Sequence, residues 1–488
     1  MLKLNLFAHQ TKGISFLSER EGAGLFWEMG VGKTRTALQA ARNFFDSRGK
    51  RKIDRVLVLC PASVRFAWLE ELRKLSSESS SFDTNVVAYK DLKFYCVEVL
   101  GTLNGNPNSH MPVAIVSYSL LQQERHSAKI ASWCAAGKTI LIADESSYLK
   151  NRTAKQTKGT RSVAEACVAR WLLSGTPVTN SPLDLWAQAE VMYPTERGKG
   201  PLYGFASWYQ FRSAYAELQL RRMGQHSFTE VVGYKNLDKL QARFSRFVSR
   251  VEKKDCLDLP EKTYTVREVA LGKDAWKLYE ELKKECLLTL SDGERKPEPN
   301  AAVRLLRLSQ LTSGHLGVTD ESEKPLDLSS EKIDWLIEAL LEGELANEKK
   351  IIIWCRWRRE RERLNEKIEG AVQIYGGQSE KQRASSILCF QNYGARILLA
   401  QPHAGGFGLN LTQAHTAVYM SNDYSWAVRA QSEDRMHRTG QSNPCLYIDV
   451  VATGPDGERT VDHAILEALK AKEDLATWTC AKWKAALC

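Results

Sequence analysis

Closely spaced cysteines are missing from this 488-residue sequence. It contains 11 cysteines, and the two nearest to each other are Cys480 and Cys488. A CxxC pair, which starts many zinc sites and disulfide redox motifs, is therefore excluded. Scattered thiols in odd number along a long chain favour a reducing compartment over a disulfide-stapled secreted fold.

Long apolar runs are missing as well. No stretch approaches the roughly 18 consecutive apolar residues that a membrane span requires. Lys3, Asn5 and His9 interrupt the first apolar residues, where a secretory signal needs an unbroken core. We therefore expect no membrane association, and a cytoplasmic location in a bacterial or phage-infected cell or a nuclear one in a eukaryote.

Neither the charge nor the composition is extreme. Lys and Arg number 68 against 58 Asp and Glu, a formal charge of +10, and 43% of the residues are hydrophobic. This apolar content supports folded cores and argues against disorder, while the small basic excess only hints at a polyanionic partner. At about 150 residues per domain, the length predicts two to four domains.

Two regions of the chain alternate short apolar runs with helix-like stretches, the pattern of parallel α/β units. The strands expected in the first region are residues 24–27, 55–60, 113–117, 139–143 and 171–174. Those expected in the second are residues 350–355, 371–375, 396–400, 416–420 and 446–451. Each region predicts a doubly wound parallel sheet.

The chain between these regions has a different character. Residues 192–330 lack strand-like runs, and charged segments such as 274–290 and 300–311 predict helices. Within the first region, the Ser-rich residues 76–81 and the turn at 104–107 predict loops between the second and third strands. The sequence therefore predicts two α/β lobes separated by a helical insertion.

A glycine-rich segment directly follows the first expected strand. Residues 28–34 read Glu-Met-Gly-Val-Gly-Lys-Thr and precede a helix-like stretch. Such loops bring backbone amides to nucleotide phosphates, the lysine binds the β and γ phosphates, and the hydroxyl binds Mg²⁺. Lys33 and Thr34 fill these last two positions. Trp27 stands where the strict pattern has its first glycine, so this segment alone leaves open an ordinary glycine turn.

An acidic pair ends the fourth expected strand. Asp144 and Glu145 lie at the carboxyl end of that strand, where a doubly wound sheet places ligand groups. Asp144 would coordinate Mg²⁺, and Glu145 would orient and deprotonate the attacking water. Such a pair alone is more often a helix cap. Together with the glycine loop of the same expected sheet, it predicts an ATPase site that uses ATP and Mg²⁺.

With both sites in place, the chain resembles the Swi/Snf-type DNA translocases of helicase superfamily II over nearly its whole length. The resemblance is carried by His9-Gln10 with Gly13 and by residues 28–34, 57–63, 116–118, 144–151, 173–180, 404–411 and 431–441. It implies two RecA-like lobes over residues 1–191 and 331–458. A helical insertion over 192–330 and a C-terminal bracing helix over 459–488 complete the implied chain.

The resemblance also implies roles for individual residues. ATP would be bound by Gln10 at the adenine and by Glu28, Met29, Gly30, Val31, Gly32, Lys33, Thr34 and Gly408. DNA would be contacted by Pro61, Ser63, Ser117, Tyr118, Gly405 and Asn410, and hydrolysis would be coupled to movement by Ser147, Ser174, Thr176 and Gln431. Ser147 stands where many members have His, and serine does not titrate near neutral pH.

Two arginines near the C-terminal end complete the implied ATPase site. A phosphate-loop lobe hydrolyses faster when an arginine stabilises the charge on the transferred phosphoryl group. Arg435 and Arg438, expected one helical turn apart, are the implied arginine fingers, although this spacing alone would indicate a solvated helix face. The basic segment 349–363, interleaved with Trp354 and Trp357, leaves open a phosphate-binding stripe or a solvated helix.

We therefore predict an ATP-dependent translocase on double-stranded DNA, forked or branched forms included. A targeting protein is an expected partner, because the motifs occupy the whole length. One alternative is a strand-separating helicase, against which the sequence shows no obvious wedge hairpin. The other is an ATP-gated DNA-binding scaffold with impaired hydrolysis, against which stand Lys33, Glu145 and both arginines.

Overall fold

The structure is a computed structural model that describes residues 6–44, 53–77, 82–89, 94–101, 110–178, 181–194, 200–223, 226–291, 299–317, 325–392, 394–405 and 409–471. These residues divide into two compact units. The first holds the described residues up to 219 together with 229–258, and the second holds 220–228 and 259–471. Across the described ranges, no helix has the length and apolarity needed to cross a membrane.

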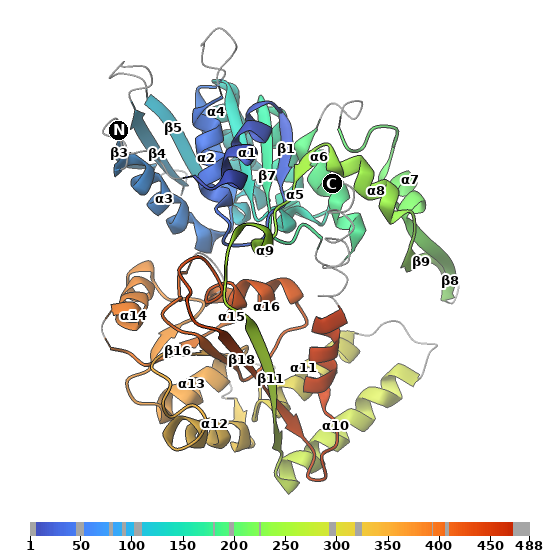
Figure 1. The fold of residues 1–488 in the computed structure, drawn as a ribbon. Helices are drawn as coiled ribbons and strands as arrows, with labels where there is room; N and C mark the ends of the chain where they lie inside the picture. The colour runs from blue at the N-terminus through green and yellow to red at the C-terminus, as the bar shows by residue number, and fades with distance from the viewer. Residues whose placement is uncertain are drawn as a thin grey trace. The chain divides into compact units, whose positions relative to one another are not determined.

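An eight-stranded sheet forms the centre of the first unit (Figure 1). Its strand order is β10-β1-β7-β6-β2-β5-β4-β3, parallel from β10 to β5 and antiparallel from β5 to β3. The strands are β1 (Gly22–Leu25), β2 (Arg55–Cys60), β3 (Phe82–Tyr89), β4 (Phe94–Gly101), β5 (His110–Ser117), β6 (Thr139–Asp144), β7 (Ala169–Leu173) and β10 (Val248–Ser249). The five strands predicted for this region are all present.

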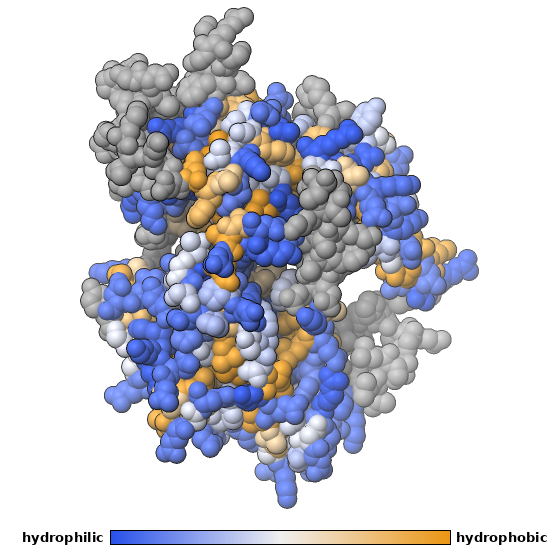
Figure 2. Space-filling view, in the orientation of Figure 1, coloured by the Kyte–Doolittle hydropathy of each residue, from blue (hydrophilic) through white to orange (hydrophobic). Residues whose placement is uncertain are grey.

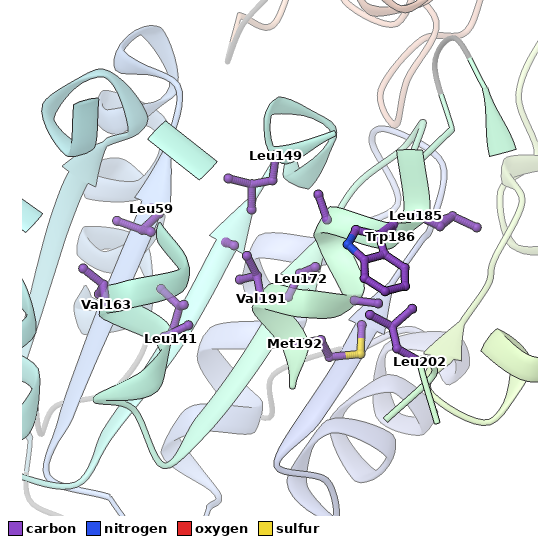
Figure 3. Close-up of a cluster of buried hydrophobic side chains, with 14 of the residues drawn as sticks. Leu59, Leu141, Leu149, Val163, Leu172, Leu185, Trp186, Val191, Met192 and Leu202 are labelled. Atoms are coloured by element: carbon purple, nitrogen blue, oxygen red, sulfur yellow. The ribbon is translucent and has the colours of Figure 1, made fainter. Parts of the chain in front are cut away.

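Helices pack on both faces of this sheet (Figure 1). The helices of this unit are α1 (Ala8–Ser18), α2 (Lys33–Arg42), α3 (Arg65–Ser77), α4 (Glu124–Ala135), α5 (Lys155–Glu165), α6 (Leu185–Met192), α7 (Trp208–Tyr215), α8 (Leu237–Ser245) and α9 (Lys253–Cys256), with 3-10 turns η1 (Ala62–Val64), η2 (Tyr118–Gln122), η3 (Ser146–Leu149) and η4 (Pro182–Asp184). On one face, Leu59 and Leu141 of the sheet pack in one core with Val163 of α5 and Trp186 of α6 (Figure 3). Burial of these apolar side chains holds the helices to the sheet.

Strands β3 and β4 occupy a region for which the sequence predicted loops. They pair antiparallel with each other, and β4 pairs with β5, so they extend the sheet at that edge. The edge of β5 supplies hydrogen-bonding partners that no local sequence pattern reveals. The turn expected at 104–107 lies outside the described residues, and the Ser-rich stretch begins in the last residues of α3.

The segment 192–330 contains more than helices. The expected helices are α10 (Lys273–Ser291) and α11 (Pro299–Thr312), but β8 (Ala216–Met223) and β9 (His226–Tyr234) form a hairpin, and β12 (His315–Leu316) pairs with β13 (Leu326–Asp327). The expectation that this segment lacks strands is therefore wrong. In addition, β10 pairs with β1, and β11 (Lys262–Ala270) pairs with β18 over nine residues. The segment thus completes an edge of both central sheets.

A six-stranded, fully parallel sheet forms the centre of the second unit. Its order is β11-β18-β17-β14-β16-β15. Besides β11, the strands are β14 (Ile351–Trp354), β15 (Val372–Ile374), β16 (Ile397–Ala400), β17 (Thr416–Tyr419) and β18 (Cys445–Thr453). All five predicted strands are present, and the predicted fold class of two doubly wound α/β lobes is confirmed.

Two separate cores lie on the two faces of this second sheet, because neighbouring side chains of each strand point to opposite faces. Ile351 and Ile353 belong to one core, and Ile352 and Trp354 belong to the other. The helices of this unit, besides α10 and α11, are α12 (Glu331–Leu341), α13 (Arg358–Lys367), α14 (Glu380–Asn392), α15 (Pro402–Gly405) and α16 (Trp426–Glu433). A further helix spans residues 461–471 and packs in one apolar cluster with α10 and α11. The rest of the expected bracing helix lies outside the described residues.

A buried carboxyl group lies on α13. Glu360 is 1% exposed, and one of its oxygens accepts a hydrogen bond from the hydroxyl of Ser421. Its other oxygen, Oε1, has no hydrogen-bond partner among the described residues. Burial raises the pKa of Glu360 to about 7, because a buried charge loses its hydration.

This raised pKa predicts a pH-dependent stability. The folded chain holds the Glu360 proton up to about pH 7 and the unfolded chain releases it near pH 4.5, so stability is highest at low pH and falls as the pH rises between these values. In the wild type, we expect Glu360 to lower the free energy of unfolding by up to about 3 kcal/mol between pH 5 and pH 8. Glu360→Gln should abolish this part of the decrease. Chemical denaturation at several pH values measures this loss.

The exposed Glu342 at the end of α12 offers the matched control, and Glu342→Gln should leave the pH profile unchanged. A Glu360→Gln profile that runs parallel to the wild-type profile would contradict the assignment.

Candidate nucleotide-binding site

The glycine loop connects β1 to α2 in the first unit. Gly30 and Gly32 have φ angles of +82° and +87°, a backbone conformation that side chains with a Cβ rarely adopt. Gly32 is also the N-cap of α2, which begins at Lys33. The loop therefore ends at a helix N-terminus, whose amides and dipole suit a phosphate group.

The ammonium group of Lys33 folds back over this loop. Its Nζ donates hydrogen bonds to the carbonyl oxygens of Trp27 (2.9 Å) and Glu28 (3.0 Å), and the residue is 9% exposed. The carboxylate of Glu28 in turn accepts from the backbone amide of Lys253 (2.6 Å). These contacts keep the lysine beside the amides of the loop, where a nucleotide phosphate would meet both.

Helix α1 attaches to the same loop through two side chains. A ring nitrogen of His9 hydrogen-bonds the carbonyl of Val31 (2.9 Å). Gln10 is 5% exposed, and its Oε1 accepts a hydrogen bond from the backbone amide of Phe7 (3.0 Å). Its side-chain nitrogen lies close to Gly32, since a Cβ on Gly32 would be only 2.1 Å from that nitrogen. Gln10 thus lies next to the phosphate loop, while its contact with adenine stays a prediction.

Trp27, the departure from the strict glycine pattern, has a structural explanation. The residue is fully buried, and its indole nitrogen donates to the hydroxyl of Ser249 beside β1 (3.0 Å). Its ring fills the space that Gly13 of α1 leaves open, since a Cβ on Gly13 would lie 2.4 Å from the ring. Trp27 therefore joins α1 and the β10 segment behind the loop.

This packing predicts the effect of a small substitution. Gly13→Ala should lower the free energy of unfolding by ~1–3 kcal/mol, because the methyl group overlaps the Trp27 ring. Helix propensity alone would raise the stability by up to ~1 kcal/mol, so the sign separates the two effects in a urea titration. Gly376→Ala is the control, since it meets no atom within 4 Å. Unchanged or increased stability of the Gly13 variant would contradict the prediction.

The acidic pair lies at the end of β6, buried among donors. Asp144 is 6% exposed, and its two oxygens accept from the indole of Trp68 (2.8 Å) and from the amide of Glu145 (3.0 Å). Glu145 is 8% exposed and has a φ of +50°, which is unusual for a residue with a side chain. Such a backbone conformation is held by its surroundings and is typical of functional sites.

Tyr118 belongs to this buried cluster. It is 2% exposed, and its hydroxyl donates to the carbonyl of Asp144 (2.7 Å). Burial, and next the charge of Asp144, raise the pKa of Tyr118 well above its usual value. The sequence prediction placed Tyr118 on DNA. In the structure its ring is buried and its hydroxyl holds the end of β6, while a contact with DNA stays a prediction.

The loop at 174–177 connects to both parts of the site. The hydroxyl of Ser146 donates to Gln188 of α6 (2.7 Å), whose amide donates to the carbonyl of Pro177 (2.7 Å). On its other side, the loop touches the glycine loop, because a Cβ on Gly175 would lie 2.8 Å from Met29. The phosphate loop, the loop at 174–177 and the acidic pair therefore form one connected cluster. Gln188, which joins these parts, was not among the predicted residues because it belongs to no recognisable motif.

The remaining predicted positions are found as follows. Ser174 is buried and its hydroxyl accepts from the amide of Thr176 (3.1 Å), and Ser147 is buried in η3. Of the positions predicted to contact DNA, Pro61 is buried, Ser63 lies in η1 and Asn410 is exposed. The hydroxyl of Ser117 hydrogen-bonds that of Ser119 (2.9 Å), and Gly405 ends α15. Gly408, predicted to contact ATP, lies outside the described residues. The DNA contacts stay predictions.

The two arginines lie in the second unit, beyond the end of a helix. Helix α16 ends at Glu433, so Arg435 and Arg438 occupy the turns that follow it. The predicted spacing of one helical turn between them is therefore wrong. The Nε of Arg435 donates to the carbonyl of Gln431 (3.1 Å), and Arg438 donates to the carbonyl of Leu409 (3.0 Å). Burial lowers the pKa of Arg438. Backbone carbonyls thus hold both guanidinium groups in defined places.

Comparison with known proteins identifies the family. A model of the SNF2-related domain matches residues 9–312, and a model of the helicase conserved C-terminal domain matches residues 331–440. The chain belongs to the SNF2-related family of helicase-like ATPases. The two parallel-sheet lobes are accordingly its RecA-like lobes.

Several curated relatives align with this SNF2-family chain. An uncharacterized ATP-dependent helicase of Mycoplasma genitalium is 24% identical, with 97% of the chain and 42% of the relative covered. The DNA annealing helicase and endonuclease ZRANB3 of Mus musculus is 24% identical (93% and 39%), and the putative ATP-dependent helicase/translocase YwqA of Bacillus subtilis is 27% identical (93% and 46%). The chain spans about two fifths of the length of these relatives.

Among solved structures, the Sulfolobus solfataricus SWI2/SNF2 ATPase core in complex with double-stranded DNA is similar to the SNF2-family chain at 20% identity. Its TM-score is 0.40, and the match covers 99% of the chain and 95% of that structure.

A buried charge network supports the arginine segment of this SNF2-family chain. Arg429 of α16 donates to Glu433 (2.8 Å) and Asp449 (2.5 Å), and Glu433 also accepts from Lys262 (3.0 Å) and Tyr264 (2.7 Å) of β11. Burial alone would raise the pKa of Glu433, but Lys262 and Arg429 lower it to about 2. Strand β11 from the insertion segment therefore fixes the helix that leads into Arg435. No motif in the sequence points to these partners.

The basic segment 349–363 makes mostly internal contacts. Lys350 donates to the carbonyls of Phe390 (2.7 Å) and Ala395 (2.7 Å), and Arg363 donates to backbone carbonyls before α12. Arg359 pairs with Asp327, and Arg361 is 4% exposed. These contacts engage the cations within the second unit and so argue against a phosphate-binding stripe.

Proposed function

We propose that the chain is an ATP-dependent DNA motor that hydrolyses ATP and translocates along double-stranded DNA. The observation that carries the proposal is the connected cluster of the first lobe, in which the phosphate loop, the acidic pair and the loop at 174–177 touch through Met29 and Gln188. A change at the γ-phosphate would alter these contacts and so shift the loop at 174–177. The domain bounds predicted from the sequence, 1–191, 192–330, 331–458 and 459–488, are part of this proposal.

The residues of the first lobe fit ATP with Mg²⁺. The oxygens of Thr34 and Asp144 are ligands that Mg²⁺ prefers, and Mg²⁺ in nucleotide sites takes one or two protein oxygens together with phosphates and water. Bound there, the ion would neutralise charge between the phosphates. Lys33 would bind the β and γ phosphates, and Glu145 would orient the attacking water and accept its proton.

The second lobe would supply Arg435 and Arg438 to the charge that develops on the γ-phosphate. Their support by backbone carbonyls and by the Glu433 network lowers the conformational cost of presenting them. Closing and reopening of the two lobes with each ATP would then move the chain along one strand of the duplex.

DNA as the track rests on family membership and on the name of a relative, the DNA annealing helicase and endonuclease ZRANB3. The double-stranded form of the track is part of the proposal. Forked or branched DNA as the preferred form, a targeting protein as partner, and a cytoplasmic location are further parts of the proposal. The chain spans about two fifths of the length of these relatives, so those longer proteins have room for parts that select a target.

Strand separation is a second candidate, and one structural feature favours it. The β8–β9 hairpin, which the sequence did not reveal, carries exposed Leu218, Leu220, Phe228 and Val232 (Figure 2). Exposed apolar side chains on a hairpin are suited to packing against a terminal base pair. A protein partner could bury the same side chains. An unwinding assay must therefore decide between the two roles of this surface.

The test compares steady-state ATP hydrolysis with duplex DNA, single-stranded DNA and RNA. The proposal expects strong stimulation by duplex DNA, and stimulation by RNA alone would contradict it. Displacement of a third strand from a triplex reports translocation, whereas unwinding of a fork reports strand separation. DNA binding without ATP hydrolysis in the presence of any of these nucleic acids would support the alternative of an ATP-gated scaffold with impaired hydrolysis.

A further inference from the structure

A cavity outside the nucleotide site lies on α8 in the first unit. It measures about 500 Å³ and is lined by side chains that include Tyr203, Lys239, Arg243, Arg246 and Phe247. This volume falls within the ~300–1,000 Å³ of most small-ligand sites. We call this cavity the α8 pocket.

The α8 pocket concentrates positive charge. Lys239, Arg243 and Arg246 follow one another at i, i+4 and i+7, so they share one face of α8 and its C-cap. They span ~10 Å along the helix axis at 1.5 Å per residue. Among the residues that the structure describes, no carboxylate lines the pocket. Within the described part of the chain, neither Lys239 nor Arg246 forms an ion pair, and both are exposed.

Helix electrostatics alone do not account for this arrangement. Cations near a helix C-terminus are stabilising, which explains Arg243 and Arg246. Lys239 lies in the first turn of α8, where a positive charge opposes the dipole. Arg243 has a structural role as well, since it donates to the carbonyls of Tyr203 and Pro201 and lies over the ring of Phe205 (4.9 Å).

The pocket also has an exposed aromatic ring. Tyr203 is 64% exposed, although burial of a ring this large is favourable. Its backbone is fixed by the bond from Arg243, while Phe247 packs edge-on against Tyr193 (5.5 Å) within the lobe. Cations that track phosphates beside an aromatic face that stacks a base are the two elements of single-strand binding. A base inside a duplex is already stacked and cannot use Tyr203 in this way.

We propose that the α8 pocket binds a single-stranded DNA segment, with Lys239, Arg243 and Arg246 on its phosphates and a base stacked on Tyr203. The site goes beyond the proposed motor function and requires no ATP hydrolysis. It would let the chain hold an unpaired strand next to a duplex.

The test uses the full chain without ATP and compares two fluorescent DNAs, a blunt duplex and the same duplex with a 12-nucleotide thymidine tail. The wild type should bind the tailed DNA more tightly. Lys239→Ala with Arg246→Ala should remove this preference and lower the slope of log affinity against log salt by ~1.4, because two phosphate contacts are lost. Affinity for the blunt duplex should not change.

Tyr203 tests the stacking part of the proposal. Tyr203→Ala should lower affinity for the tailed DNA by roughly 5- to 150-fold, the range for loss of one stacked base, whereas Tyr203→Phe should retain it. Arg243 is left intact because it holds the backbone of the pocket.

The matched control is Lys129→Ala with Lys158→Ala, which removes two exposed cations from α4 and α5 of the same lobe. An equal loss in this control would show a general effect of charge and overturn the proposal. The absence of a tail preference in the wild type, or its persistence in the α8 pocket variant, would overturn it too. Loss of binding to free ATP or inorganic phosphate without any change on tailed DNA would assign the pocket to a small anion instead. None of these outcomes depends on ATPase activity.

Discussion

Replacing Glu145 by Gln is expected to lower the kcat of ATP hydrolysis by ~10²–10⁴-fold while ATP binding persists. A positioned general base contributes a factor of this size, and the amide keeps the shape of the side chain without its basicity. The backbone at Glu145, with φ +50°, accepts Gln as it accepts Glu. Single-turnover hydrolysis and equilibrium binding of a fluorescent ATP analogue separate the two effects.

Two companion variants sharpen this test. Lys33→Ala should lose hydrolysis and weaken nucleotide binding, because the ammonium group serves the bound phosphates before any reaction. Glu165→Gln at the end of α5 removes an exposed carboxylate and should change neither quantity. Unchanged ATP turnover in the Lys33 variant would remove the whole site assignment.

Removal of either arginine is expected to have an effect at least as large. Arg435→Ala or Arg438→Ala should lower kcat by ~10³–10⁵-fold, the contribution of an arginine finger. The affinity for ATP should change little, since the guanidinium group would act on charge that develops during transfer. DNA-stimulated steady-state hydrolysis, measured beside ATP binding, checks both statements.

Loss of folding must be distinguished from loss of chemistry in these variants. Arg429→Ala removes the shared arginine partner of the buried Glu433 and Asp449 and should destabilise the second unit by ~3–5 kcal/mol. The Arg435 and Arg438 variants should lose less stability than this, about 0.5–1.5 kcal/mol each, because each removes a hydrogen bond to a backbone carbonyl. Arg459→Ala, which removes an exposed cation of the same unit, should retain full activity. Full activity in either finger variant would contradict the assignment.

The local parts of the fold were predictable because each carries its own signal. The predicted runs at 55–60, 139–143 and 396–400 form β2, β6 and β16, since strands buried on both faces read as continuous apolar segments. The glycines at 30 and 32 adopt the left-handed conformation that a phosphate loop requires. The acidic pair lies at a strand end, as the run before it indicated.

The edges of the sheets were not predictable in this way. Strand β10 has two residues, and β11 alternates exposed and half-buried positions within a charged sequence. Each becomes a strand because a distant partner, β1 or β18, offers unpaired backbone groups. The same long-range pairing brings Lys262 and Tyr264 to Glu433, and no pattern in the sequence links these residues.

By itself, the sequence determined the two α/β lobes, the glycine loop, the acidic pair and the family, because these depend on neighbouring residues and their spacing. Only the tertiary structure decided why Trp27 is compatible with the loop, since its partners Gly13 and Ser249 come from distant segments. It also brought the hydroxyl of Tyr118 to the backbone carbonyl of Asp144, and assembled the α8 pocket from residues 40 positions apart. Contacts of this kind arise from packing, which joins residues without regard to their order in the chain.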